Sequence, residues 1–209
     1  MIYYPIQKMK EMGLTEVLLV SGKGHAGHFL ELLSSGQGFG LKLAYEVQEE
    51  AGGIAQALSL AENFVGNEKC AVILGDNIFF DDLRGAKQAF EQGDSKAHLF
   101  LKQVPRPQSY GVPRIENERI VDIFEKPIIP PSSYAVTGCY FYAPDVFDRI
   151  RLLKPSERGE LEITDVNRSY AQEGTLSFDY LKDFWGDCGE SIDGMMEVAR
   201  TIQDRLQAI

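Results

Sequence analysis

Residues 70–77 read CAVILGDN, a short apolar run that ends in Gly75 and Asp76. An apolar run of this length that is bounded by turn residues is typical of a strand covered on both faces. A carboxylate directly after such a strand is expected at the C-terminal edge of a parallel sheet, where open α/β folds bind their ligands. The stretch therefore predicts an α/β fold with a ligand site at Asp76.

The segments on either side alternate in the same way. Apolar runs rich in β-branched and aromatic residues predict strands, and amphipathic spacing predicts helices. The expected helices are 2–13, 25–34, 54–65, 81–92, 144–153, 161–172 and 191–206, and the expected strands are 16–21, 41–48, 70–74, 97–104, 118–127, 134–143 and 175–181. The order of these segments favours an α/β layer architecture, with a mixed sheet contributed by the second half of the chain.

The composition limits the classes of function. The 209 residues are 44% hydrophobic and 25% charged, which is enough apolar material for one compact domain, and we expect residues 1–209 to form it. The formal net charge of −10 argues against nucleic-acid and membrane-surface partners. Three cysteines without a CxxC spacing indicate neither a disulfide framework nor a zinc site. We expect a cytoplasmic protein, since the opening MIYYPIQKMK lacks the order of a signal peptide.

Two carboxylates are candidate metal ligands. Asp76 follows one predicted strand, and Asp187 follows another in the segment FWGDCG. Oxygen donors of this kind bind hard divalent cations, so both side chains converging on one ion would create a metal site. The alternative is that Asp76 caps the turn into the next helix.

Three further motifs have both a functional and a structural interpretation. GKGHAG at 22–27 fits the dinucleotide pattern GxGxxG, with Glu46 about 20 residues on, although glycine-rich turns also arise for backbone reasons. Gly52 and Gly53 precede a helix and would offer free N–H groups to a phosphate or a base edge; the alternative is an ordinary tight turn. Glu125 and Lys126 end a strand before a proline, so alternation predicts that they point to opposite faces, one toward a ligand and one toward solvent; the alternative is a solvated rim.

Eight short blocks occur in the order MIYYP (1–5), YEVQ (45–48), GGIAQA (52–57), ILGDNIF (73–79), SYGV (109–112), EKP (125–127), YAVTG (134–138) and RGELEITD (158–165). Together they resemble the bacterial glucose-1-phosphate thymidylyltransferases, a family of sugar-nucleotide pyrophosphorylases. The resemblance implies the nucleotide-diphospho-sugar transferase fold, in which a Rossmann-like mixed central sheet is flanked by helices in three αβα layers. It also implies a homo-oligomer and a role in making deoxysugars of the rhamnose type and cell-surface polysaccharides.

The same resemblance implies roles for individual residues. By it, Gln48 and Gly53 read the thymine base, and Asp76 and Asp187 bind Mg²⁺. Tyr110, Gly111, Glu125, Lys126 and Val136 form the sugar-phosphate pocket, with Glu125 accepting from glucose hydroxyls and Lys126 facing phosphate. The implied reaction is attack of glucose 1-phosphate on the α-phosphorus of dTTP, which yields dTDP-glucose and pyrophosphate. Such a transfer needs in-line positioning and charge neutralisation more than a covalent nucleophile.

In the family, a strand and a glycine-rich loop with an Arg and a Lys precede the MIYYP block. The sequence lacks these before Met1, so we expect strands 16–21 and 70–74 each to have an unpaired edge, and this polypeptide alone to be a weak or inactive enzyme. Two alternatives stay open. One is a catalytically silent protein that binds sugar nucleotides, and the other is an NAD-dependent oxidoreductase based on GKGHAG.

Overall fold

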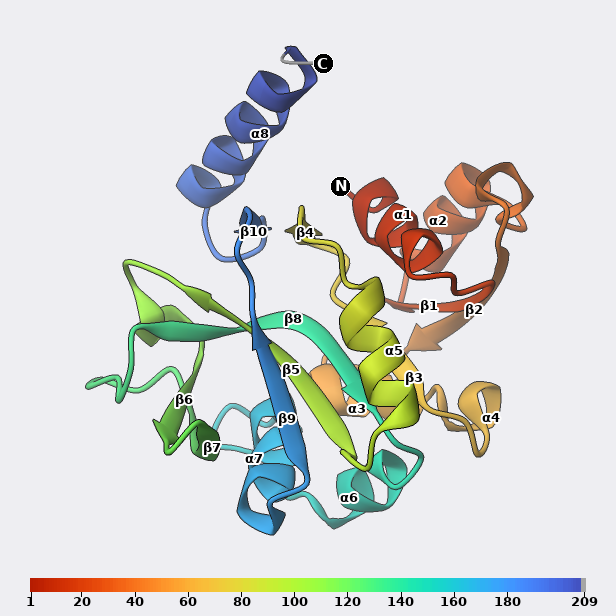
Figure 1. Cartoon of the computed structure of the whole chain (residues 1–209). Helices are drawn as coiled ribbons and strands as arrows, with labels where there is room; N and C mark the ends of the chain where they lie inside the picture. The colour runs from red at the N-terminus through yellow and green to blue at the C-terminus, as the bar shows by residue number, and fades with distance from the viewer. Residues whose placement is uncertain (208–209) are drawn as a thin grey trace.

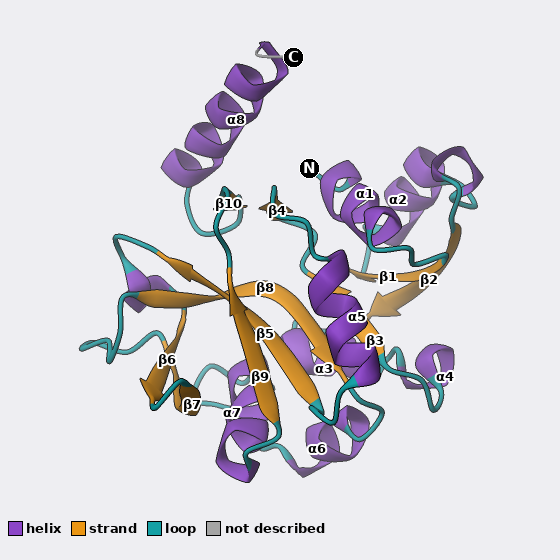
Figure 2. Ribbon diagram, viewed as in Figure 1, coloured by secondary structure: helices purple, strands orange, loops and turns teal. Residues whose placement is uncertain are grey.

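The computed structural model describes residues 1–207 and is built around a four-stranded mixed sheet (Figures 1 and 2). Its strand order is β3 (Cys70–Ile73), β8 (Tyr134–Tyr142), β5 (Ala97–Gln103) and β9 (Leu176–Tyr180). The central strand β8 runs antiparallel to both neighbours, while β9 runs parallel to β5. The predicted mixed α/β fold is thereby confirmed.

Helices cover both faces of this sheet because its strands are apolar on both sides. On β5, Leu99 and Leu101 pack toward α3 (Ile54–Ser59), α6 (Val146–Leu152) and α7 (Ile163–Glu173). Phe100 lies between them and packs on the opposite side, toward α5 (Arg84–Gln92) and α1 (Tyr3–Glu11). All three side chains are at most 1% exposed. Burial on both faces explains why this strand reads as an apolar run rather than an alternating pattern.

The remaining elements form smaller units around the main sheet. They are β1 (Glu16–Gly22), α2 (Ala26–Leu33), η1 (Gln37–Phe39), β2 (Lys42–Gln48), α4 (Glu62–Val65), β4 (Asn77–Phe79), η2 (Pro107–Ser109), β6 (Gly111–Glu116), β7 (Arg119–Glu125), β10 (Trp185–Asp187) and α8 (Ile192–Gln207). Strands β1 and β2 pair in parallel, whereas β6 with β7 and β4 with β10 pair antiparallel. Within residues 1–207, none of the helices is long and apolar enough to cross a bilayer.

Strands β1 and β3 each have one edge without a strand partner in the described part of the chain. β1 pairs with β2 only, and β3 pairs with β8 only. This is the arrangement that the sequence predicted for these two strands. The position of Asp76 needs a correction, however, because the strand that precedes it has an antiparallel partner and does not end at the edge of a purely parallel sheet.

Two predicted helices have different bounds in the structure. The helix expected at 54–65 is divided into α3 and α4, because Leu60 and Ala61 donate to carbonyls three residues back. The helix expected at 81–92 begins only at Arg84. There the Asp82 carboxylate accepts the Arg84 N–H at 3.0 Å and satisfies a donor of the first turn.

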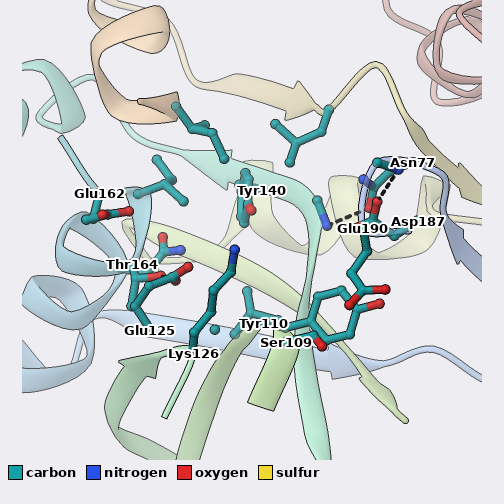
Figure 3. Close-up of a pocket in the computed structure, with 18 of the residues that line it drawn as sticks. Asn77, Ser109, Tyr110, Glu125, Lys126, Tyr140, Glu162, Thr164, Asp187 and Glu190 are labelled. Atoms are coloured by element: carbon teal, nitrogen blue, oxygen red, sulfur yellow. Dashed lines mark hydrogen bonds between the residues drawn. The ribbon is translucent and has the colours of Figure 1, made fainter. Parts of the chain in front are cut away.

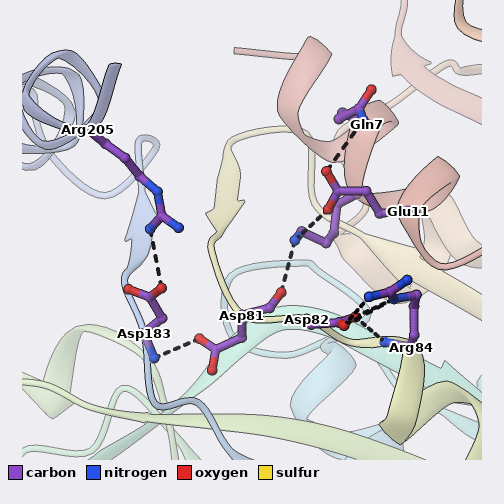
Figure 4. Close-up of polar contacts among 8 residues, drawn as sticks. Gln7, Glu11, Asp81, Asp82, Arg84, Asp183 and Arg205 are labelled. Atoms are coloured by element: carbon purple, nitrogen blue, oxygen red, sulfur yellow. Dashed lines mark hydrogen bonds and ion pairs between the residues drawn. The ribbon is translucent and has the colours of Figure 1, made fainter. Parts of the chain in front are cut away.

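Asp81 joins three segments that lie far apart in the sequence (Figure 4). Its carbonyl oxygen accepts from Lys8 of α1 at 2.9 Å, and its carboxylate accepts the N–H groups of Lys182 and Asp183 at 2.8 and 3.0 Å. The Asp183 carboxylate in turn pairs with Arg205 of α8 at 3.2 Å. These contacts hold the start of β10 beside β4.

His98 is a buried histidine in β5. It is 6% exposed, and its ring stacks on Phe141 with a centroid distance of 5.6 Å. Its Nδ1 is 2.9 Å from the Ser177 hydroxyl. Burial lowers the pKa of His98 from 6.5 to about 4, although the carboxylate of Asp179 opposes that shift.

The low pKa predicts how stability depends on pH. Below about pH 6.5 the unfolded chain takes up a proton at His98, whereas the folded protein stays neutral there until about pH 4. This group therefore lowers the free energy of unfolding by up to about 1.4 kcal/mol per pH unit in that window, and has no effect above it. The substitution His98→Phe should remove this contribution to the change in the free energy of unfolding with pH. Urea unfolding of both proteins at pH 7.5 and pH 5 measures it, and equal pH slopes would contradict the assignment.

Candidate active site

A cavity of about 260 Å³ opens beside the ends of β3 and β7 and along β8 (Figure 3). Seven residues predicted from the sequence line it together: Asp76, Tyr110, Gly111, Glu125, Lys126, Val136 and Asp187. They come from loops and strands that span more than half of the chain. The predicted sugar-phosphate residues and the two predicted metal ligands therefore share one space, although their chemical roles follow from the resemblance alone.

Asp76 and Asp187 are neighbours because β4 and β10 pair with each other. Asp187 lies opposite Asn77 in that ladder, and the Cys188 N–H donates to the Asp76 carbonyl at 2.9 Å. Gly189 packs against both carboxylates. A Cβ at this glycine would lie 2.2 Å from Asp76 Oδ2 and 3.4 Å from Asp187 Oδ1, so the two carboxylates face the same small space.

The buried side chain of Asn77 orients this pair. Its Nδ2 donates to Asp76 Oδ1 at 2.9 Å. Its Oδ1 accepts from the Trp185 indole at 2.8 Å and from the Gly138 N–H at 3.0 Å. One amide group thereby ties the Asp76 carboxylate to β10 and to the central strand β8.

The two carboxylates suit a hard divalent cation. Asp187 is largely buried, and burial together with the charge of Asp76 raises its pKa, while the N–H of Gly189 opposes the rise. Two like charges in one buried space repel each other unless a cation lies between them. Within residues 1–207 no cluster of three His, Cys, Asp or Glu side chains is arranged to hold a metal. A cation here would therefore complete its coordination with water or ligand oxygens, as Mg²⁺ commonly does.

Glu125 and Lys126 both line the cavity, which corrects the prediction that they point to opposite faces. Strand β7 ends at Glu125, and Lys126 has a φ of +43°, so the strand alternation stops at this residue. The Lys126 N–H donates to the Tyr110 carbonyl at 3.0 Å and fixes the turn. Figure 3 shows the Lys126 side chain extending between Glu125 on one side and Asp187 with Glu190 on the other.

Several cavity residues had no assigned role in the sequence analysis. The Thr164 hydroxyl donates to Glu125 Oε2 at 2.5 Å, and Arg158 lies 3.7 Å from Glu125 Oε1. The Glu190 carboxylate accepts from the Ser109 hydroxyl, which lowers the pKa of Glu190. Others in the lining are Asn77, Gly138, Tyr140, Glu160, Glu162, Asn167 and Trp185. The blocks ILGDNIF and RGELEITD contained five of these eleven residues, but only contacts in the folded chain single them out.

Gln48 and Gly53 lie outside the lining of this cavity and contact each other. Gln48 Nε2 donates to the Gly53 carbonyl at 3.1 Å. The helix start beside Gly53 is not a set of free donors as predicted, because the Ala55 N–H donates to the Leu161 carbonyl at 3.2 Å. Gly53 has a φ of +93°, and a Cβ there would lie 2.6 Å from the same carbonyl, so only glycine fits.

The GKGHAG segment lies between β1 and α2, away from the cavity lining. Lys23 forms an ion pair with Glu49 at 2.8 Å, and both side chains are largely exposed. Glu46, the predicted acceptor for a ribose, lies within β2. These contacts give the dinucleotide interpretation no geometric support.

Comparisons with known proteins agree with this geometry. A family model described as "Nucleotidyl transferase" matches residues 1–205. A glucose-1-phosphate thymidylyltransferase of Neisseria meningitidis is 39% identical over 98% of this chain and 73% of its own length. One from Actinoplanes sp. is also 39% identical, over 95% of this chain and 66% of its own length.

Solved structures show the same similarity. A Bacillus anthracis protein assigned as a glucose-1-phosphate thymidylyltransferase, solved with sucrose, superimposes with a TM-score of 0.89. It is 45% identical, over 94% of this chain and 79% of its own. A UDP-glucose pyrophosphorylase solved with UDP-glucose has a TM-score of 0.83 at 25% identity, over 98% of this chain and 86% of its own.

Asn77→Leu tests the buried amide. Leucine leaves the Trp185 indole and the Gly138 N–H without an acceptor, at about 1–3 kcal/mol for each buried group. The free energy of unfolding, measured with urea, should therefore fall by a few kcal/mol. The control is the same leucine substitution in a Trp185→Phe background, where the indole donor to Asn77 is already absent. If leucine costs as much there as in the unmodified protein, the indole hydrogen bond does not hold this region together.

Proposed function

Because the chain belongs to the nucleotidyl transferase family, we propose that it transfers the thymidylyl group of dTTP to glucose 1-phosphate, giving dTDP-glucose and pyrophosphate. The names of the relatives from Neisseria meningitidis and Actinoplanes sp. support this choice of substrates. The single observation that carries the proposal is the pairing of Asp76 and Asp187 beside a cavity that also holds Glu125 and Lys126. We also propose that residues 1–209 act as one domain, which agrees with a family match over residues 1–205.

The charges around the cavity explain why a cation belongs to this proposal. The lining contains Lys126 and Arg158 as cations but six carboxylates, which are Asp76, Glu125, Glu160, Glu162, Asp187 and Glu190. Such a surface repels phosphate groups unless positive charge is added. We propose Mg²⁺ as that charge, held by Asp76 and Asp187. When bound, it would neutralise the phosphate oxygens during the transfer.

The chain's own residues would bind and orient the two substrates. Glu125, fixed by Thr164, accepts hydrogen bonds from glucose hydroxyls, and Lys126 faces the phosphate of glucose 1-phosphate. Tyr110, Gly111 and Val136 complete the sugar pocket, and a Cβ at Gly111 would lie 3.2 Å from Thr164 Oγ1, a close contact. Gln48 and Gly53 read the thymine base. Holding the phosphate oxygen in line with the α-phosphorus of dTTP supplies most of the rate enhancement expected for such a transfer.

We also propose how the product is used, and in which oligomeric state and compartment the enzyme acts. dTDP-glucose would serve the synthesis of rhamnose-type deoxysugars and cell-surface polysaccharides, and the enzyme would act as a homo-oligomer in the cytoplasm. Three unpaired thiols, Cys70, Cys139 and Cys188, agree with a reducing compartment. Neither alternative function gains support from the comparisons, whose names are those of nucleotidyltransferases and pyrophosphorylases. The expected weak turnover is untested and stays a prediction.

Pyrophosphate release from dTTP and glucose 1-phosphate tests the reaction. We expect release that requires both substrates, with dTDP-glucose appearing in equal amount. Lys126→Ala should lower kcat/KM by about 10²–10³-fold, the usual effect of removing a group that stabilises developing charge. Lys182→Ala, outside the cavity, is the matched control. Binding of dTDP-glucose without any turnover would instead favour the silent sugar-nucleotide-binding protein.

Metal dependence tests the role of the carboxylates. Chelation with EDTA should abolish turnover, and Mg²⁺ should restore it. Asp187→Asn should weaken binding of Mn²⁺, followed by electron paramagnetic resonance, as well as turnover. Asp148→Asn, an exposed carboxylate on α6, serves as the control. Unchanged Mn²⁺ affinity in the Asp187 variant would show that this side chain does not hold the ion.

A further inference from the structure

The side chain of Gln48 is held by two acceptors at once. Its Nε2 donates to the Gly53 carbonyl at 3.1 Å and to Oε1 of Gln56 at 2.5 Å. Both acceptors belong to the segment GGIAQA, which starts α3. Gln56 thus contacts Gln48, the residue proposed to bind the thymine base, from within α3.

These contacts fix which way the Gln48 amide points. Rotating the amide by half a turn would bring Oε1 against the Gly53 carbonyl oxygen, and two acceptors repel each other. The Nε2 group therefore stays on the side of Gly53 and Gln56. The Gln48 Oε1 atom is then left to accept a hydrogen bond, and it is not one of the fully buried polar atoms without a partner.

The Gln56 side chain packs closely against Gly52. A Cβ at Gly52 would lie 2.6 Å from Gln56 Cδ and 2.7 Å from its Oε1, so the missing side chain of Gly52 makes room for this amide. The Gly52 carbonyl accepts the Leu161 N–H at 2.8 Å, and the Leu161 carbonyl accepts from Ala55. The backbone around Gln56 is therefore held against the loop that precedes α7.

We propose that Gln56 is a positioning residue that sets base specificity, and this inference rests on the proposed function. By accepting from Nε2, it holds Gln48 Oε1 as an acceptor toward the base. Thymine and uracil carry an N3–H that can donate to this oxygen. Cytosine has an unprotonated N3, which would face Oε1 lone pair to lone pair. The arrangement selects imide pyrimidines over cytosine and does not separate thymine from uracil, since both present the same N3–H.

Discrimination against cytosine follows from hydrogen bonding. A site built to accept a hydrogen bond discriminates strongly against a ligand that cannot donate, because its polar group loses its partner on binding. Loss of the Gln56 acceptor leaves only the Gly53 carbonyl to oppose rotation of the Gln48 amide, so the turned amide, whose Nε2 can donate to N3 of cytosine, becomes more populated. One hydrogen bond corresponds to about a tenfold change in relative affinity.

The test compares Gln56→Leu with Gln56→Glu. Leucine has a similar size but cannot accept from Nε2, whereas glutamate keeps the acceptor and is the matched control. The full chain is assayed for kcat/KM with dTTP and with dCTP, and for the KM of glucose 1-phosphate. We expect the dTTP to dCTP ratio to fall about tenfold or more in Gln56→Leu and to stay high in Gln56→Glu. The KM of glucose 1-phosphate should not change, whereas general damage to the fold would alter it.

A second measurement separates this inference from the proposed function. Isothermal titration with dTDP and dCDP reports base preference without turnover, and the melting temperature of each variant reports folding. If Gln56→Leu is unstable, Gln56→Met replaces it as the variant that cannot accept. Preference for dTDP that is lost only in the leucine or methionine variant supports the inference, even if no pyrophosphate is released.

Three results would overturn the role of Gln56. They are an unchanged base ratio in the leucine or methionine variant, an equal loss in the glutamate variant, and no preference for dTDP over dCDP in the unmodified protein. Absence of pyrophosphate release from every nucleotide, with dTDP still bound in preference to dCDP, would overturn the proposed reaction alone.

Discussion

The arrangement of the whole molecule depends on one strand, β8, which is buried on both faces and bonded on both edges. Tyr140 and Tyr142 point toward α3, α6 and α7, while Cys139 and Phe141 point toward α5. Its hydrogen bonds to β3 and β5 make those two strands run parallel to each other, and β9 follows β5. The chain therefore leaves β3 and β9 at the same end of the sheet, and this end is where Asp76 and Asp187 meet.

The site joins this rigid sheet to short segments that have little structure of their own. β4 and β10 have three residues each, too few for independent stability. Asn77 ties them to Gly138 of β8, and Asp81 ties the entry of β10 to α1. The catalytic proposal thus relies on buried hydrogen bonds between segments more than 50 residues apart, which a low dielectric makes strong when they are complete.

The charge of the cavity links the fold to the proposed chemistry. Carboxylates such as Glu125 and Glu162 are partly neutralised by Arg158, whereas Asp76 and Asp187 share a space in which no basic side chain of residues 1–207 is bonded to either. A protein of net charge −10 can accept a sugar phosphate at such a place only with local positive charge. This requirement for added charge is the physical reason for including a divalent cation in the proposed mechanism.

Much of the secondary structure follows from local pattern. The run CAVIL predicted a buried strand, and β3 forms there, although its residues are only partly buried. The predicted helices 2–13, 144–153 and 161–172 match α1, α6 and α7 within a few residues. Two errors come from local backbone features that apolar periodicity does not report. The Asp82 carboxylate accepts the Arg84 N–H just before the helix that was expected to begin at 81, and the left-handed backbone at Lys126 turns its side chain into the same cavity as Glu125.

The sequence by itself determined the α/β class, the order of the elements and seven of the residues that line the cavity, because apolar periodicity and the family-like blocks are properties of short segments. Tertiary structure alone decided that β8 runs antiparallel between β3 and β5 and that Asp187 pairs with Asp76 across more than 100 residues. It also decided that Gln56 faces Gln48. These contacts form only when sheet pairing brings distant segments together, and that pairing cannot be predicted from spacing along the chain.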